Sequence, residues 1–359
     1  MKRTTDYGWE RFSALPLADK AECFARPDGM PFHTIFAQQF GRGTLDRLCD
    51  AATQIRAIAK TRAGMEFLQG QLFHKRAMIY FTQPSSRTFL SFLSACQILG
   101  LRTGEVRDAS VSSEFKGESR EDSIRTFSSY FDLIIMRTRE KGLAEKMAWA
   151  LSRSRRPVPI INAGSGKDQH PTQALLDVYT LRRSFERRGG LRGLTVVYVG
   201  DLARGRTVRS LSQLLANYEG IRHVFVAPAQ LAIGEDVLAS LRAAGQECVV
   251  SDDMAKWLPE ADAVYMTRIQ DEWDESRGES ARIDTSRFKI GLDQMRLMKP
   301  GAILMHPLPR RDEIAPEVDS DPRSMYWRQV RNGMWMRAAL IASTFDRLSR
   351  IDKYYRDNL

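Results

Sequence analysis

Four hydrogen-bonding side chains follow an apolar run in the stretch FTQPSSRTFLSF. They are Ser85, Ser86, Arg87 and Thr88, and they stand where the run 77–81 ends and a helical pattern begins. The N-terminus of a helix carries unpaired N–H groups and partial positive charge, while hydroxyls and a guanidinium add donors suited to phosphate. The stretch therefore indicates a phosphate-binding turn, with an ordinary serine cap beside a solvent-facing arginine as the alternative.

Arginine and histidine follow two other apolar runs. Arg137 ends the run in LIIMRTRE, and His170 and Gln173 lie three residues apart in NAGSGKDQHPTQALLD, where Pro171 suits the first turn of a helix. Such groups at strand ends can stabilise an oxygen that gains negative charge. The alternatives are a salt-bridged strand end for Arg137 and a capping or core role for His170.

Three later motifs also follow apolar runs. VYVGDLARGRTVRSLSQLL places Arg206 at a helix start, YMTRIQ places Arg268 and Gln270 two apart, and HPLPRRDEI holds two prolines that fix a rigid loop. The glycine pattern is not the GxGxxG of a dinucleotide site. The motifs contain no Ser-His-acid order and no carboxylate pair. They suit the binding of multiply anionic substrates and the stabilisation of charge more than proton abstraction by a carboxylate.

Short β-branched runs alternate with amphipathic segments through most of the chain. The expected strands are 77–81, 133–137, 158–162, 194–199, 223–227, 263–267 and 302–306. This alternation predicts βαβ units and an α/β fold with mainly parallel sheets. Right-handed crossovers place the loops after the strands on one edge of each sheet, where such folds bind ligands. Because the polar motifs all follow strands, we expect them at that edge.

Composition excludes several classes of protein. The chain has 359 residues, of which 43% are hydrophobic and 27% charged, as is usual for a soluble protein of about two domains. It shows no membrane-length apolar run, no secretory h-region and no HExxH, and its four scattered cysteines form no CxxC, which favours a reducing cytoplasm without a bound metal. The net charge of +10 fits arginines gathered around anionic small molecules. Without a basic stripe interleaved with aromatic residues, nucleic-acid binding is the distant alternative.

Taken together, the six motifs resemble the aspartate/ornithine carbamoyltransferase family from about residue 33 to about residue 345. HPLP is similar to the aspartate branch, because ornithine enzymes typically carry a cysteine where Pro307 stands. The resemblance implies transfer of the carbamoyl group of carbamoyl phosphate to the neutral amine of L-aspartate, in pyrimidine biosynthesis. The leaving phosphate would accept the amine proton, which agrees with the absence of an obvious base.

The resemblance also implies roles for the motif residues. The phosphate of carbamoyl phosphate would be bound by Ser85, Ser86, Arg87, Thr88 and Arg137. Its carbonyl oxygen would be polarised by Thr88, Arg137 and His170, and its amino group held by Gln173 and the backbone at Leu308. Arg87, Thr88, Arg137 and His170 would be the catalytic residues.

Aspartate would bind through Arg206, Arg268, Gln270 and Lys116. The loop SVSSEFKGES matches a family loop that enters the active site of a neighbouring subunit. Ser112 and Lys116 would therefore act in trans, and the minimal active unit would be a homotrimer with shared sites. Further assembly with regulatory or dihydroorotase chains is compatible with the resemblance, which implies no cofactor, nucleic acid or membrane.

The implied fold is α/β, with two doubly wound parallel-sheet domains, the active site between them and a C-terminal helix that packs back on the first. Residues 1–32 would form an N-terminal extension. Residues 33–171, completed by the helix 332–359, would bind carbamoyl phosphate, and residues 172–331 would bind aspartate.

The sequence departs from the family at three charged positions and in one loop. Gln83 stands where a glutamate is usual, Phe89 and Trp273 stand where arginines are usual, and the segment 271–280 is unlike the family's loop. In the family, the charges at the positions of Gln83 and Trp273 help to bridge the two domains in the closed state. Two alternatives therefore stay open: a carbamoyltransferase for another amino acid, and a non-catalytic homologue that serves as a structural partner.

Overall fold

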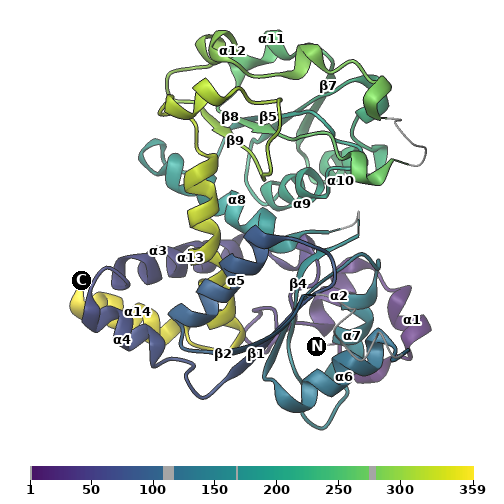
Figure 1. Cartoon of the computed structure of the whole chain (residues 1–359), viewed down its shortest axis with the longest axis vertical. Coiled ribbons are helices and arrows are strands. Elements are labelled where there is room, and N and C mark those ends of the chain that lie inside the picture. Colours follow the sequence, from purple (N-terminus) through teal and green to yellow (C-terminus); the bar gives the residue numbers. More distant parts are fainter. Residues whose placement is uncertain (1, 108–116, 167–168, 275–279) are drawn as a thin grey trace. The chain divides into compact units, whose positions relative to one another are not determined.

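The chain folds into two compact units in a computed structural model that describes residues 2–107, 117–166, 169–274 and 280–359 (Figure 1). Unit 1 comprises Met1–Leu175 and Gly333–Leu359, and unit 2 comprises Leu176–Asn332. The helices α8 (Pro171–Ser184) and α13 (Tyr326–Thr344) contribute residues to both units. The predicted α/β fold with two parallel sheets is confirmed.

The described part of unit 1 is built on a four-stranded parallel sheet of order β2-β1-β3-β4. The strands are β1 (Arg76–Phe81), β2 (Arg102–Val106), β3 (Leu133–Thr138) and β4 (Ile160–Ser165). All six residues of β3 are buried, as expected for a central strand covered on both faces, and all six residues of β4, at one end of the order, are buried as well. Thr34 extends the sheet beyond β4, since its N–H donates to the Ile160 carbonyl (2.8 Å) and its carbonyl accepts from the Asn162 N–H (2.8 Å).

Helices surround this sheet. They are α1 (Trp9–Ser13), α2 (Leu17–Cys23), α3 (Arg42–Ile58), α4 (Arg62–Gln69), α5 (Ser86–Ile98), α6 (Arg120–Tyr130), α7 (Leu143–Ser152) and α14 (Leu348–Asn358). The strand order reverses between β1 and β3, so right-handed crossovers place α5 on one face of the sheet and α6 and α7 on the other, which is the doubly wound arrangement.

Residues 2–32 contribute to the core of unit 1. Phe12 and Phe24 are buried with the sheet residues Ile134 and Met136 in one apolar cluster. The two helices of this segment have five and seven residues, so they are too short to show a helical period in the sequence.

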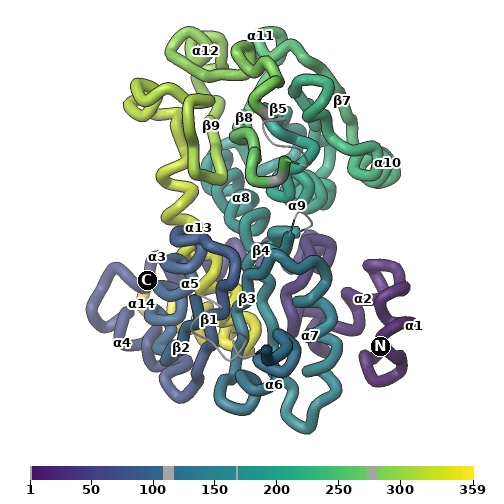
Figure 2. The backbone as a smooth tube through the Cα atoms, turned by 45° about the vertical axis from the view of Figure 1, so that its right-hand side comes forward, coloured from purple at the N-terminus to yellow at the C-terminus, as the bar shows by residue number. Residues whose placement is uncertain are grey.

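The C-terminal segment forms two helices, where the sequence indicates one helical segment over 332–359. Helix α13 ends at Thr344 and α14 begins at Leu348, and Asp346 between them has a φ of 55°. Helix α14 lies beside α3 and α4 (Figure 2), where Tyr354 stacks on Phe67 at 3.9 Å between ring centroids. The expected return of the C-terminal helix to the first unit is therefore confirmed.

The described part of unit 2 holds a five-stranded parallel sheet of order β7-β6-β5-β8-β9. Its strands are β5 (Thr195–Val199), β6 (Arg222–Val226), β7 (Glu247–Ser251), β8 (Ala263–Met266) and β9 (Ile303–Met305), and its further α-helices are α9 (Arg206–Leu215), α10 (Glu235–Ala243), α11 (Met254–Trp257) and α12 (Leu292–Leu297). Side chains of β5, β6, β8 and β9 form the centre of its apolar core.

The sequence analysis missed two of these nine strands, β2 and β7. Both lie at an edge of their sheet, and neither has a fully buried residue. Edge strands that face solvent are often short and polar, so β2 and β7 lack the apolar run by which the other strands were predicted. The strands at the opposite edges, β4 and β9, are buried and have such a run.

Candidate active site

The strand order of each sheet reverses at one point. In unit 1 the order reverses between β1 and β3, and in unit 2 it reverses between β5 and β8. Open parallel sheets bind ligands at the carboxyl ends of the strands that flank such a reversal. The predicted site residues of both units follow these strands.

In unit 1, the loop after β1 is bonded to the end of β3. The carbonyl of Arg137 accepts hydrogen bonds from the N–H groups of Thr82 (3.0 Å) and Gln83 (3.3 Å). The arginine at the end of β3 is therefore fixed next to the turn that leads into α5.

The turn at the start of α5 has the predicted form. Ser85 is the N-cap residue, with extended backbone, and its carbonyl accepts from the Phe89 N–H (3.1 Å). Within the described chain the Ser85 hydroxyl caps none of the first N–H groups of α5. Thr88 is buried, while Ser86 and Arg87 are exposed. Hydroxyl, guanidinium and helix N–H donors thus gather at one helix end, which suits an anion.

Arg137, Ala163 and His170 form a buried cluster in unit 1. The Arg137 Nη1 atom donates to the Ala163 carbonyl (3.1 Å) and lies 3.4 Å from His170 Nε2. Because guanidinium nitrogens only donate, Nε2 is the acceptor and the imidazole proton is on Nδ1. Arg137 is 8% exposed and His170 is 4% exposed. A cation and a histidine in such a dry setting can stabilise an oxygen that becomes negative.

Gly164 permits this cluster. Its φ is 118°, and a Cβ atom there would lie 2.6 Å from Arg137 Nη1 and 3.3 Å from His170 Cδ2. The sequence analysis did not identify this glycine. Its position in NAGSG directly after an apolar run was the available signal.

Helix α8 begins as predicted, with Pro171 as its first residue. The N–H of Gln173 donates to the His170 carbonyl (3.0 Å), and the Gln173 side chain is 8% exposed. His170 and Gln173 are therefore joined through the first turn of α8.

In unit 2, Asp201 joins the loops after β5 and β8. Its carboxylate accepts from the N–H groups of Arg204 (3.1 Å) and Gln270 (3.0 Å). Burial raises the pKa of Asp201, although these hydrogen bonds act in the opposite direction. A Cβ atom at Gly200 would lie 2.2 Å from the Thr267 carbonyl oxygen, so only glycine allows these two strand ends to approach so closely.

Two predicted cations lie near this junction. Arg206 is the first residue of α9, and burial lowers its pKa to about 10, so the guanidinium is still charged at neutral pH. Arg268 donates to the Ile269 carbonyl (2.7 Å) and binds both carboxylate oxygens of Glu272. Burial raises the pKa of Glu272 and the Arg268 hydrogen bonds lower it, with a net decrease. Sequence reasoning had not named Glu272, which orients Arg268.

The loop at Leu308 follows β9 and has an unusual backbone. Leu308 has a φ of 55°, and its N–H donates to His306 Nδ1 (2.8 Å). His306 Nε2 in turn donates to Glu313 (2.8 Å), and Arg311 binds the Asp271 carboxylate with two hydrogen bonds (2.8 and 2.9 Å). Since the N–H of Leu308 is bonded within the loop, its carbonyl is the backbone group that can accept from a ligand's amino group.

The sequence analysis also named two residues of a loop and two positions that depart from the family. Ser112 and Lys116 lie outside the described residues. Phe89 is buried edge-on against Phe81 (5.7 Å between centroids), and the Arg107 guanidinium lies 4.4 Å from its ring centroid. The Gln83 Oε1 atom is buried with no hydrogen-bond partner among the described residues.

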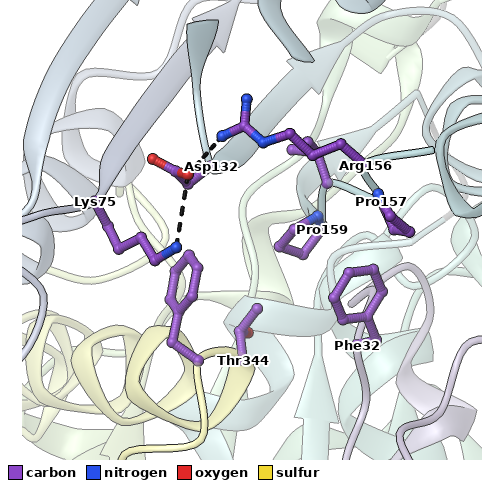
Figure 3. A pocket seen from close by; sticks show the side chains of 9 residues that line it. Phe32, Lys75, Asp132, Arg156, Pro157, Pro159 and Thr344 are labelled. Atoms are coloured by element: carbon purple, nitrogen blue, oxygen red, sulfur yellow. Dashed lines mark hydrogen bonds and ion pairs between the residues drawn. The ribbon is translucent and has the colours of Figure 1, made fainter. Parts of the chain in front are cut away.

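A cavity of about 220 Å³ in unit 1 lies away from these groups (Figure 3). Lys75, Asp132 and Pro159 line it, and each directly precedes a strand of the sheet, at the edge opposite to Arg137. Lys75 and Arg156 both point to the carboxylate of Asp132, at 3.7 and 2.6 Å. Both cations of the cavity thus already contact the Asp132 carboxylate, and the cavity lies away from the predicted site residues. We therefore do not assign the candidate active site to this cavity.

Two general findings concern the described residues. Among them, no helix combines the length and the apolar character needed to cross a membrane. In the same ranges, no group of three or more His, Cys, Asp or Glu side chains is arranged to hold a metal ion.

Comparison with known proteins finds two family models. Residues 33–183 match the carbamoyl-P binding domain of aspartate/ornithine carbamoyltransferases, and residues 192–344 match the Asp/Orn binding domain. The chain is 41% identical to the chloroplastic aspartate carbamoyltransferase of Arabidopsis thaliana over 86% of this chain and 76% of the relative. It is 39% identical to the aspartate carbamoyltransferase catalytic subunit of Chromobacterium violaceum over 86% of this chain and 96% of the relative.

Solved structures give the same result. Aspartate transcarbamoylase from Trypanosoma cruzi with carbamoyl aspartate and phosphate has a TM-score of 0.78 and 34% identity, covering 87% of this chain and 95% of that chain. The catalytic subunit of M. Jannaschii aspartate transcarbamoylase has a TM-score of 0.76 and 33% identity, covering 88% of this chain and 98% of that chain. Two family domains in order, similar relatives over most of the chain and the same fold lead to one conclusion: the chain belongs to the aspartate/ornithine carbamoyltransferase family.

Proposed function

We propose that the protein is an aspartate carbamoyltransferase, which converts carbamoyl phosphate and L-aspartate to N-carbamoyl-L-aspartate and phosphate. The observation that carries the proposal is the buried pair of Arg137 and His170 at the carboxyl edge of unit 1, beside the polar turn that opens α5. The names of the relatives support the choice of substrates.

Carbamoyl phosphate binds in unit 1 in this proposal. Ser85, Ser86, Arg87 and Thr88 hold the phosphate with the N-terminus of α5, together with Arg137. Thr88, Arg137 and His170 face the carbonyl oxygen, while Gln173 and the Leu308 carbonyl accept from the amino group. The description of the family model for residues 33–183 supports this assignment.

Aspartate binds through residues of unit 2. Arg206, Arg268 and Gln270 follow β5 and β8, and two guanidinium groups suit the two carboxylates of a dicarboxylic amino acid. The bond between Arg268 and Glu272 restricts the rotamer of the arginine before the substrate arrives, which reduces the entropy lost on binding.

The reaction needs no dedicated protein base. The neutral amine of aspartate attacks the carbamoyl carbon and the carbonyl oxygen becomes negative. The C–O bond to phosphate then breaks, and the leaving phosphate accepts the amine proton. Arg137 and His170 stabilise the oxyanion, and loss of one such donor typically costs about 3 kcal/mol of barrier.

The assembly and location extend the proposal further. A homotrimer would bring Ser112 and Lys116 of a neighbouring subunit to each site, and regulatory or dihydroorotase chains could associate with it. The scattered cysteines favour a reducing compartment such as the cytoplasm, whereas the plant relatives are chloroplastic by name.

Steady-state kinetics with carbamoyl phosphate and a panel of amines test the proposal. We expect N-carbamoyl-aspartate to form, and the substitution Arg137→Ala to reduce kcat by about 100-fold or more. Failure with aspartate and turnover of another amine would assign a different acceptor. No phosphate release with any amine would support the non-catalytic alternative.

A further inference from the structure

Asn162, in β4, uses every polar group of its side chain within unit 1. Its Oδ1 atom accepts from the Gly164 N–H (2.8 Å), and its Nδ2 atom donates to the Ile35 carbonyl (2.9 Å) and to Ser165 Oγ (3.2 Å). The residue is 2% exposed. An asparagine that bonds the N–H two residues ahead forms a side-chain turn and fixes the intervening peptide.

The peptide fixed in this way contacts Arg137. The carbonyl of Ala163 accepts from Arg137 Nη1, and Gly164 lies so close to the same nitrogen that a Cβ atom would be 2.6 Å away. The turn therefore supplies both the acceptor that orients the guanidinium and the surface against which it rests. His170 Nε2 lies 3.4 Å from the same nitrogen.

We infer that Asn162 is a positioning residue for the reaction, acting through Ala163 and Gly164 on the guanidinium of Arg137. The inference rests on the proposed function, in which Arg137 stabilises the developing oxyanion. Asparagine suits the position because it combines an acceptor for Gly164 with a donor for Ile35. Aspartate has the same shape, but it would place a carboxylate oxygen against the Ile35 carbonyl, where both groups only accept.

The first experiment compares kcat for Asn162→Ala and Asn162→Ser. We expect Asn162→Ala to lower kcat about 10- to 100-fold, because a small misplacement of a catalytic group has an effect of that size. Asn162→Ser loses the bonds to Ile35 and Ser165 but keeps an oxygen that can accept from the Gly164 N–H. It should therefore recover most of the lost kcat. Equal loss in both variants would overturn the inference, since it would trace the effect to the structural bonds alone.

Asn332→Ala is the matched control. Asn332 is also buried, in unit 2, and donates to Thr180 Oγ1 (3.1 Å). This substitution removes one buried asparagine bond without touching the peptide that holds Arg137. We expect a lower melting temperature with kcat within about twofold of wild type. A loss of kcat as large as that of Asn162→Ala would contradict a specific role for Asn162.

A double-mutant cycle tests whether the effect passes through Arg137. In an Arg137→Ala background, Asn162→Ala should change kcat by less than about twofold, because the group that it positions is gone. Independent, multiplicative losses would overturn the inference.

Binding of inorganic phosphate separates this inference from the proposed function. If the wild type forms no carbamoyl product, its affinity for phosphate, measured by calorimetry, still reports on Arg137. Asn162→Ala should then weaken phosphate binding about 10-fold and Asn162→Ser by less. In such a protein the missing product overturns the proposed function alone, and it is an unchanged phosphate affinity of Asn162→Ala that would overturn the inference.

Discussion

Arg137 meets His170 because the chain between them supplies a carbonyl at Ala163 and no side chain at Gly164. The arginine side chain is long and flexible, so the chemistry of its guanidinium alone does not fix the position of that group. Its surroundings do: a backbone acceptor at 3.1 Å and a glycine with a φ of 118°. At the residue scale, the site depends on this backbone geometry as much as on its charged side chains.

Gly164→Ala should therefore reduce kcat by about 100-fold while the protein still folds. The added methyl group meets the end of a flexible side chain, so the arginine moves away from its productive position. Measurement of kcat and of the melting temperature separates the two effects.

Gly189→Ala is the control for backbone strain. Gly189 also has a positive φ, of 89°, but among the described residues an added Cβ atom would have no neighbour within 4 Å. We expect a stability loss of about 1 kcal/mol and an unchanged kcat. A wild-type kcat for Gly164→Ala would show that Arg137 is not held by this contact.

The end of α13 illustrates how an element boundary is set. The Arg347 N–H donates to the Ala342 carbonyl (2.9 Å) and the Asp346 N–H to the Ser343 carbonyl (3.0 Å), which is a Schellman motif. This motif requires a left-handed residue at Asp346, where glycine is usual. The motif turns the chain so that α14 can return to α3.

Asp346→Gly should stabilise the protein by about 1 kcal/mol, because glycine adopts the left-handed conformation without a steric cost. Asp346 also pairs with Arg26 (3.2 Å), but its side chain is 78% exposed, so little is lost with the charge. Asp346→Asn is the control that removes only the charge. Urea unfolding should rank glycine above asparagine and aspartate; the reverse order would assign the larger contribution to the ion pair.

The two units repeat one architectural solution. Each has a parallel sheet whose strand order reverses once, and each presents arginines after the strands at that reversal. Unit 1 offers Arg137 with a helix N-terminus, and unit 2 offers Arg206 and Arg268. For the whole molecule, this repetition suits two anionic substrates, one for each unit.

The proposed trimer makes a prediction at this scale. Arg137→Ala and Lys116→Ala chains should each be nearly inactive alone. Mixed and reassembled in equal amounts, they should regain up to about a quarter of wild-type activity. An intact site needs Arg137 from one chain and Lys116 from its neighbour, and in an equal mixture each of these chains is the intact one with a chance of one half. Mixtures that stay as inactive as their parents would indicate that Lys116 acts on the site of its own chain.

Much of the fold followed from local patterns. The buried strands are continuous apolar runs, so seven strands and the α/β class were predictable from hydrophobic periodicity. The edge strands β2 and β7 and the helices α1 and α2 were not, because a short or half-exposed element has too few buried positions to show a pattern.

The sequence by itself determined which groups the protein offers for chemistry: Ser85 to Thr88, Arg137, His170 and the arginines of unit 2, each after an apolar run. Only the tertiary structure decided how these groups are held. Asn162 reaches Ile35, Arg137 reaches Ala163 and Asp201 reaches Gln270 across gaps of 26 to 127 residues. Such contacts are formed by strand pairing and burial, so spacing along the chain carries no record of them.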